Sequence, residues 1–325
     1  MRMILIFTER DSLKRSFAAI TAEIVFCMSV LCFTGCQENT TDNKDDSTYS
    51  IVCTFFAQYD WINNIISEAE NVSVSLICDN GTDLHSYQMT ARDMLDISSC
   101  DLLIVIGGES DKWAQDAGKA SGVKVVSLTE LAQVDINEHL HEQDNTEDIH
   151  GDEHLWLSVK KAKELTDKLS EIICSEVQND SIKNQAEEYI KKLDELDMEY
   201  EKACSRENGV LVVADRFPFA HLAKDYNIEC FAAFDGCSAD TDAGFETVIE
   251  LAGIVDENNL KYVIVTENSD KKTARAVIDS TREKNAEILV LDSMQSLTEN
   301  DIKGGAGYIG IMEENLRVIS TAFES

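Results

Sequence analysis

The chain has 325 residues and a formal net charge of −33, which comes from 61 acidic and 28 basic side chains. A surface of this sign repels nucleic acid and anionic lipid and attracts cations, so no nucleic-acid partner is expected. The length allows two domains or one large one. None of the 10 cysteines is paired as C-x-x-C, so the patterns of a zinc ribbon and of a thioredoxin-type redox site are absent from the sequence.

The N-terminal segment has the order of residues found in a secretory signal peptide. Basic residues within the first 15 positions precede a largely apolar stretch, which Glu23 interrupts before it reaches Cys36. This stretch is too short for a membrane span, which needs roughly 20 predominantly apolar residues. The letters FTGC (33–36) resemble a bacterial lipobox. We therefore predict a signal peptide over 1–35, lipidation of Cys36 and a polar tether over 36–49; an ordinary secretory signal and an uncleaved anchor are the alternatives.

Two series of short, β-branched apolar segments alternate with helical patterns along the rest of the chain. This alternation is typical of parallel sheets covered by helices. We predict an N-terminal lobe over 50–178 and a C-terminal lobe over 207–325. The expected strands cover residues 50–56, 72–78, 101–107 and 123–128 in the first lobe, and 210–214, 228–234, 262–267 and 287–292 in the second.

A single amphipathic helix is predicted between the lobes, over residues 179–206. Apolar side chains such as Ile182, Ala186, Leu193 and Tyr200 recur at helical spacing, and neither Gly nor Pro interrupts them. A coiled-coil dimerisation helix is the alternative interpretation. The predicted fold class is therefore α/β, with two lobes that are each a mainly parallel sheet flanked by helices, joined by one long rigid helix.

Potential metal ligands follow the predicted strands. His85 follows the second strand, His154 follows an acidic loop, and Asp215 and Asp292 end strands of the second lobe. In open α/β sheets, ligands bind beyond the carboxyl ends of the strands, so these side chains are expected to converge on a cleft between the lobes. Imidazole and carboxylate together suit Zn²⁺, and Mn²⁺ becomes the alternative as the share of carboxylates rises.

At these positions the sequence resembles the metal-binding receptors of bacterial zinc and manganese ABC importers. The segments that carry the resemblance are GTDLHSYQMTARD (81–93), CDLLIVIGGESDKW (100–113), DEHLWLS (152–158), AHLAKDYNIE (220–229) and LVLDSM (289–294). The resemblance extends over essentially the whole chain after the signal. It implies that His85, His154 and Asp292 are the first, second and fourth ligands of a metal ion held between two lobes.

The resemblance also implies a function. The chain is expected to be an extracytoplasmic receptor, with zinc favoured over manganese, that is anchored to the cell membrane by an N-terminal lipid. It would deliver its ion to the permease subunits of an ABC importer, act as a monomer and have no enzymatic activity. A metallohydrolase is the enzyme alternative, but the sequence contains no H-E-x-x-H, G-x-S-x-G or P-loop pattern.

The third ligand departs from the family pattern. The family usually has His or Glu at this register, and here it falls on Arg216, which has no lone pair to give a metal. Three replacements remain open: Asp215 after a shift of one residue, His221 turned inward, or water together with Glu267. We favour Asp215, an oxygen donor, with Arg216 as a cation that orients or neutralises an acid beside the metal. A helix N-cap or a partner for Arg216 is the alternative role for Asp215.

The segment 135–153 is rich in histidine and acidic residues, and it contains neither Lys nor Arg. Similar loops occur in zinc-specific members of the family that the chain resembles. His139, His141 and His150 would gather zinc weakly near the cleft. The alternative is a solvated acidic loop without a metal role.

Overall fold

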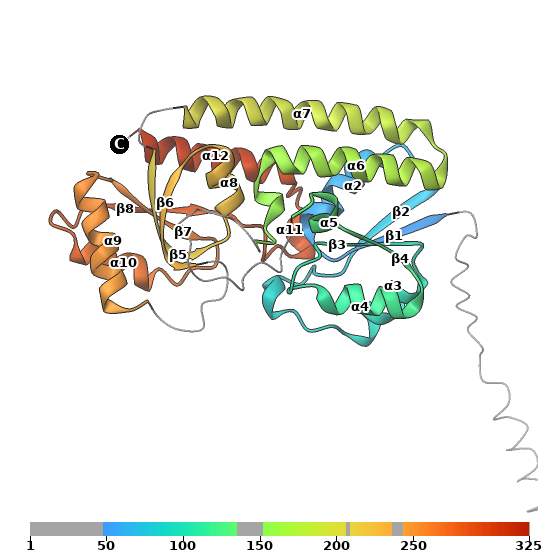
Figure 1. The fold of residues 1–325 in the computed structure, drawn as a ribbon, viewed down its shortest axis with the longest axis horizontal. Coiled ribbons are helices and arrows are strands. Elements are labelled where there is room, and N and C mark those ends of the chain that lie inside the picture. The colour runs from blue at the N-terminus through green and yellow to red at the C-terminus, as the bar shows by residue number, and fades with distance from the viewer. Residues whose placement is uncertain (1–47, 135–151, 206–208, 236–242, 325) are drawn as a thin grey trace, which may run out of the picture. The chain divides into compact units, whose positions relative to one another are not determined.

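Two parallel sheets with their covering helices make up the part of the chain that the structure describes (Figure 1). The structure is a computed structural model, and it describes residues 48–134, 152–205, 209–235 and 243–324. From Thr48 onward the chain forms one compact unit. Within the described residues, no helix is both long enough and apolar enough to cross a membrane.

The first sheet has the strand order β2-β1-β3-β4, and all of its neighbouring strands are parallel. Strand β3 (LLIV) is apolar and buried along its whole length, whereas β2 (VSVSL) alternates apolar residues with serines. The strands are β1 (Tyr49–Cys53), β2 (Val72–Leu76), β3 (Leu102–Val105) and β4 (Lys124–Ser127). The helices of this half are α2 (Phe56–Ile65), α3 (Ala91–Ser99), α4 (Lys112–Ser121) and α5 (Leu128–Leu131), with short 3₁₀ turns η1 (Leu84–Ser86) and η2 (Leu155–Leu157).

The second sheet repeats this topology, with the order β6-β5-β7-β8 and parallel neighbours throughout. Its strands are β5 (Val210–Phe217), β6 (Glu229–Asp235), β7 (Tyr262–Thr266) and β8 (Glu287–Leu291). Its helices are α8 (Ala220–Asp225), α9 (Phe245–Glu257), α10 (Lys272–Ser280) and α12 (Tyr308–Phe323). Helix α11 (Glu299–Lys303) lies beside the first half, where the N–H of Glu299 donates to the carbonyl oxygen of Asp79 over 2.7 Å (Figure 1). In both sheets the order places the first strand of the series next to the third, which is the result of βαβ crossovers.

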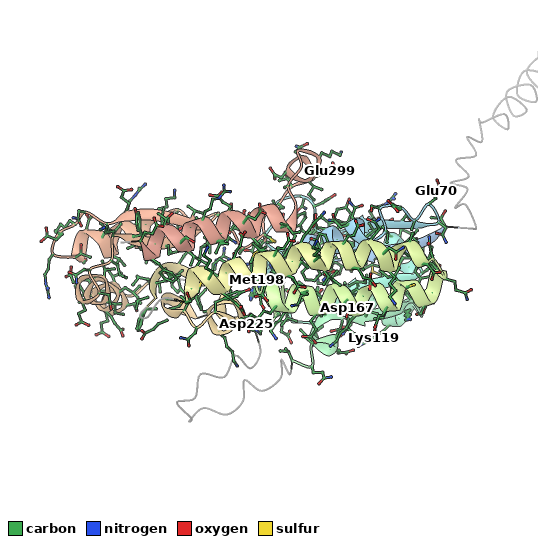
Figure 2. All side chains as sticks on the ribbon, turned by 90° about the horizontal axis from the view of Figure 1, so that it is seen from above. Glu70, Lys119, Asp167, Met198, Asp225 and Glu299 are labelled. Atoms are coloured by element: carbon green, nitrogen blue, oxygen red, sulfur yellow. The ribbon has the colours of Figure 1, made fainter. Side chains whose placement is uncertain are left out.

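Two long helices, α6 (Val159–Val177) and α7 (Asp180–Cys204), connect the halves. Helix α7 packs on α2, α6 and α12 (Figure 1). Its buried tyrosines also donate hydrogen bonds in both directions: the Tyr189 hydroxyl donates to Asp60 on α2 over 3.0 Å, and the Tyr200 hydroxyl to the carbonyl oxygen of Met312 on α12 over 2.7 Å. Met198 lies exposed on the same helix (Figure 2). Helix α7 is therefore bound to both halves of the molecule along one face.

A single main core runs through both sheets. It includes Ile51 and Leu103 from the first sheet and Val213 and Ile264 from the second. A smaller core lies between the second sheet and the helices α9 and α10. Because the main core is shared, the two halves bury apolar surface against common neighbours, and that burial stabilises both of them.

Two buried hydrogen bonds join the halves through Trp156. Its indole Nε1 donates to the carbonyl oxygen of Ser293, next to the end of β8, over 3.0 Å. The hydroxyl of Tyr308, on α12, donates to the carbonyl oxygen of Trp156 over 2.6 Å. Both aromatic side chains are fully buried. The segment that carries His154 is therefore held directly against the loop that carries Asp292.

The predicted fold class is confirmed, since there are two parallel sheets flanked by helices and a long helix between them. The ends of the predicted strands differ from the observed ends by up to three residues, and two of these differences bear on the tether and on Asp215. The first strand begins at Tyr49, inside the segment predicted as tether. Strand β5 was predicted to end at 214, but it continues through a register shift to Phe217, where the following Pro218 has no N–H to extend the pairing. The predicted signal peptide and Cys36 lie outside the described residues.

Replacing Tyr308 by Phe should lower the free energy of unfolding by about 1–3 kcal/mol, because the carbonyl oxygen of Trp156 would stay buried without its donor. Urea denaturation would measure this loss as a lower midpoint concentration, with the slope of the unfolding free energy against urea concentration unchanged. Tyr59→Phe is the matched control, since no hydrogen bond of the Tyr59 hydroxyl is found among the described residues. Equal losses in the two variants would contradict the prediction.

Candidate metal centre

Two D-x-H turns place the histidines of the first half. Oδ1 of Asp83 accepts a hydrogen bond from the backbone N–H of His85 over 3.0 Å, and Oδ1 of Asp152 accepts one from the N–H of His154, also over 3.0 Å. Each aspartate thus closes a local turn two residues ahead of its histidine. Each turn then continues into a 3₁₀ turn, η1 or η2. The same short motif therefore sets the backbone at both histidines.

Carboxylates also hold the Nδ1 atom of both rings. Nδ1 of His154 lies 2.5 Å from Oδ1 of Asp152, and Nδ1 of His85 lies 3.3 Å from Oε1 of Glu153. Glu153 is itself fixed, because its other oxygen accepts a hydrogen bond from the N–H of Ser110 over 3.3 Å. It lies against Gly108, where a Cβ atom would come within 1.4 Å of Oε2. Only glycine leaves room for this carboxylate.

The two Nε2 atoms face each other at 3.2 Å. A carboxylate accepts only, so it keeps the proton of each neutral ring on Nδ1 and leaves a lone pair on Nε2. When both rings are neutral in this way, the two nitrogens can bind one cation together. With Zn–N distances of about 2.0–2.1 Å, a 3.2 Å separation corresponds to an N–Zn–N angle of about 100–106°, close to tetrahedral.

His221 reaches the same region from the second half. It is buried on α8, and its Nε2 donates to the carbonyl oxygen of Asp152 over 2.9 Å. Burial lowers the pKa of His221 despite the opposing charge of Asp152, so the ring is favoured in its neutral form. For Asp152, burial acts to raise the pKa, but the hydrogen bond and charge of His154 and the charge of His221 outweigh it and lower the pKa. His221 therefore supports the His154 turn.

Arg216 lies at the end of β5 and contacts the other D-x-H turn. Its Nη1 donates to Oδ2 of Asp83 over 2.9 Å. Asp215, which was predicted to end its strand, lies inside β5 instead. Its Oδ2 accepts hydrogen bonds from the hydroxyl and the N–H of Thr266 at 3.1 and 3.3 Å, and its Oδ1 accepts one from the N–H of Arg216 at 2.8 Å. Both of its oxygens already have donors.

Asp292 directly follows β8, and α12 fixes its backbone. The side chain of Asn315 accepts from the N–H of Asp292 and donates to its carbonyl oxygen, both over 2.8 Å. Burial, and then the charge of Glu267, raise the pKa of Asp292 to about 6. Glu267 in turn accepts hydrogen bonds from the N–H and the hydroxyl of Ser293 at 2.9 and 2.8 Å. Glu267 thus holds the loop that carries Asp292.

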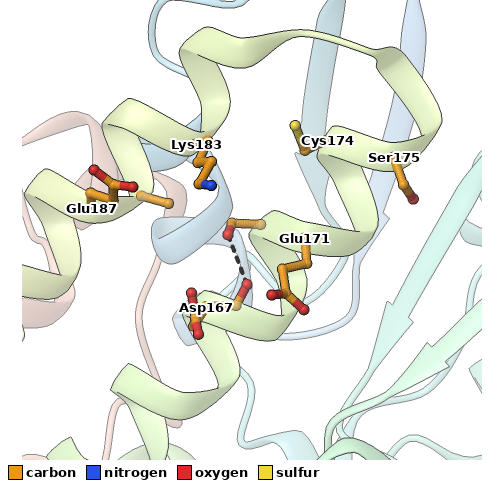
Figure 3. Close-up of a pocket in the computed structure, with 8 residues that line it drawn as sticks. Asp167, Glu171, Cys174, Ser175, Lys183 and Glu187 are labelled. Atoms are coloured by element: carbon orange, nitrogen blue, oxygen red, sulfur yellow. Dashed lines mark hydrogen bonds between the residues drawn. The ribbon is translucent and has the colours of Figure 1, made fainter.

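The structure brings His85 and His154 together, but it gathers no third ligand with them. Within the described ranges, no three His, Cys, Asp or Glu side chains form a group that would hold a metal ion. His139, His141 and His150 lie outside those ranges. A separate pocket of about 290 Å³ lies between α6 and α7, lined by charged and small residues including Asp167, Glu171 and Lys183 (Figure 3). No histidine lines it.

The residues that support the histidines are not evident as functional residues in the sequence. Asp83, Asp152 and Glu153 all contact the histidines, but the motifs point only to the histidines themselves. The sequence did contain a signal, since Asp stands two residues before His in both TDLH (82–85) and GDEH (151–154). The role of Asn315 had a weaker signal, a single amide on the apolar face of α12.

Comparison with known proteins identifies the family. The family model described as "Zinc-uptake complex component A periplasmic" matches residues 51–322. The chain belongs to this ZnuA family. The match extends over both sheets and includes both D-x-H turns.

Two relatives show how the chain compares in length. It is 26% identical over 307 residues to the zinc-binding lipoprotein AdcA of Streptococcus pneumoniae, covering 91% of this chain but 60% of that protein. It is 25% identical to the high-affinity zinc uptake system protein ZnuA of Bacillus subtilis, covering 90% of this chain and 92% of that protein. The chain thus spans less than two thirds of the AdcA proteins and nearly all of the Bacillus relative.

A solved structure supports the fold of this ZnuA-family chain. The Zn(II)-bound ZnuA-like domain of Streptococcus pneumoniae AdcA aligns with a TM-score of 0.67 at 24% identity, covering 86% of this chain and 100% of that domain. The likeness concerns the arrangement of the two sheets and their helices.

Asp292→Asn should stabilise the metal-free protein at pH 8 by about 1–3 kcal/mol. The carboxyl pKa rises from 3.8 to about 6 on folding, so the fold pays for ionisation of this group at alkaline pH. Ionisation of Asp292 does not reduce the stability of the wild type below pH 3.8, where the carboxyl is protonated in both the folded and the unfolded state. The stability is lost as the pH rises through about 6. The advantage of the variant should therefore shrink between pH 8 and pH 4, which urea denaturation at both pH values would measure. A constant advantage would exclude ionisation as its cause.

Proposed function

We propose that this protein is an extracytoplasmic receptor that binds one zinc ion and delivers it to an ABC importer. The observation that carries the proposal is the pair of facing Nε2 atoms, each opposite a carboxylate-bound Nδ1. Carboxylate partners of this kind orient histidine ligands and raise their basicity. Membership in a zinc-uptake family and the names of its zinc-binding relatives support the same function.

The proposed ligands are His85 and His154 from the first half and Asp292 and Asp215 from the second. The two acidic side chains would have to move toward the histidine pair, because no third ligand is grouped with it among the described residues. For Asp215 this means exchanging the hydrogen bonds from Thr266 for the metal. Asp292 keeps its backbone fixed by Asn315 while its side chain moves.

Zinc is favoured over manganese because two imidazoles form the preassembled part of the site. Imidazole nitrogen suits Zn²⁺, whereas Mn²⁺ prefers sites made mainly of carboxylate, carbonyl and water oxygens. Manganese stays the alternative, since two carboxylates complete the proposed ligand set. In this role zinc is the cargo that is carried, and no substrate is converted.

The proposal also concerns location and partners. We propose that residues 1–35 are removed and that Cys36 carries a lipid which holds the receptor at the outer face of the cell membrane. Its partners would be the permease subunits of the importer, and the receptor would act as a monomer. The segment with His139, His141 and His150 would gather zinc near the site with low affinity.

Replacing both His85 and His154 by Ala should abolish tight zinc binding, because it removes the two ligands that already lie together among the described residues. Calorimetry with a competing chelator would measure the affinity for Zn²⁺ and, in parallel, for Mn²⁺. The control is a double variant with His139→Ala and His141→Ala, which removes two imidazoles outside the proposed site and should keep tight binding. If the variant without His85 and His154 keeps the full zinc affinity of the wild type, these two histidines are not zinc ligands.

Single substitutions rank the remaining ligands. Asp292→Asn and Asp215→Asn should each weaken zinc binding by roughly 10- to 1,000-fold, about 1.4–4 kcal/mol. His221→Ala should weaken it less, because Nε2 of His221 already donates to the carbonyl oxygen of Asp152. The same calorimetry decides the ranking. If His221→Ala weakens zinc binding more than Asp215→Asn does, then His221 is the ligand. Asp215 then serves only to link β5 to β7 through its hydrogen bond from Thr266.

A further inference from the structure

The second sheet holds the His85 turn through one ion pair. Nη1 of Arg216 lies 2.9 Å from Oδ2 of Asp83, and the two side chains are 28% and 19% exposed. The other oxygen of Asp83 accepts the N–H of His85. Both carboxylate oxygens are therefore used, one toward the second sheet and one toward the histidine. The guanidinium fixes the orientation of the carboxylate that sets the backbone of His85.

The Arg216–Asp83 pair is partly buried, whereas several ion pairs of the protein lie at the surface. Arg282, for example, pairs with Asp256 at 3.6 Å, but its side chain is 78% exposed. Exposed pairs are screened by water and hold their partners weakly, whereas a partly buried pair interacts through a lower effective dielectric. The Arg216–Asp83 contact is therefore able to restrain the turn.

The same short segment supports the other histidine turn. Five residues after Arg216, His221 donates to the carbonyl oxygen of Asp152, whose side chain holds both the N–H and Nδ1 of His154. Pro218 lies between the two contacts and restricts the backbone there. Residues 216–221 thus contact both aspartates that precede the histidines.

We propose that Arg216 is a positioning residue for metal binding, which orients His85 through Asp83 from the opposite sheet. The inference rests on the proposed function, because it takes His85 as a zinc ligand. It assigns to Arg216, which has no lone pair for a metal, an indirect part in the same site. Residues that orient metal ligands typically contribute 10- to 100-fold to metal affinity.

The sign of the effect separates positioning from simple charge. Arg216→Ala removes a cation near a cation site, so electrostatics alone would tighten zinc binding. Loss of positioning predicts the opposite, a dissociation constant for Zn²⁺ about 10-fold or more higher than in the wild type. Arg216→Lys keeps the charge and should recover part of the affinity. Arg282→Ala removes the same charge from an exposed pair and should bind zinc like the wild type.

A second substitution tests the pathway through Asp83. Asp83→Asn keeps an oxygen for the N–H of His85 but presents an amide or a neutral oxygen to Arg216. It should weaken zinc binding about as much as Arg216→Ala, and the double variant should be no weaker than either single variant, because both remove one interaction. Asp83→Asn also provides the test if Arg216→Ala fails to fold. The absorption spectrum of bound Co²⁺ should change in both variants, since it reports the geometry of the ligands.

The outcomes separate this inference from the proposed function. Zinc binding in Arg216→Ala within about twofold of the wild type, or tighter, would overturn the inference and leave the receptor proposal intact. Weaker binding with an unchanged Co²⁺ spectrum would also overturn it, because Arg216 would then act on stability rather than on ligand geometry. A wild-type protein that binds no zinc would overturn the proposed function and this inference together.

Discussion

The structure is organised around two imidazole nitrogens that face each other at 3.2 Å. Each ring is held by a carboxylate on its far side, so neither ring can turn away from the other without breaking that contact. The supporting turns, the ion pair from the second sheet and the buried indole all restrain this one arrangement.

The two halves contribute differently to the site. In the proposed site, the first half would supply nitrogen ligands on short turns that local hydrogen bonds already fix, while the second half would supply carboxylates that have other partners here, such as Asp215 with Thr266. Asp292 shows the cost of this division, because burial and the charge of Glu267 make its ionised form less favourable than in water. The proposed nitrogen ligands are thus already placed together, whereas Asp215, a proposed oxygen ligand, is held by other hydrogen bonds.

The fold was predictable from the sequence because its signals are local and repeated. Runs such as LLIV at β3 and the helical spacing of α7 specify the elements, and their alternation specifies parallel sheets. That His85 and His154 lie close together was predictable for a similar reason, since each belongs to a recognisable short motif. The partners of Asp215 and Arg216 were not, because they depend on the extension of β5 past residue 214 and on side chains that lie far away in sequence. Strand ends and long-range pairs leave little trace in a single sequence.

The hydrogen bonds of Trp156 limit how the halves can separate. A hinge opening between them would have to free the Ser293 carbonyl oxygen and the Tyr308 hydroxyl from buried partners and expose a shared apolar core to water. Rotation of a few acidic side chains would break only local contacts. A carrier built in this way would load and release its ion without a large domain movement. A membrane partner would then have to sense loading from the shape and charge near the site rather than from the angle between the lobes.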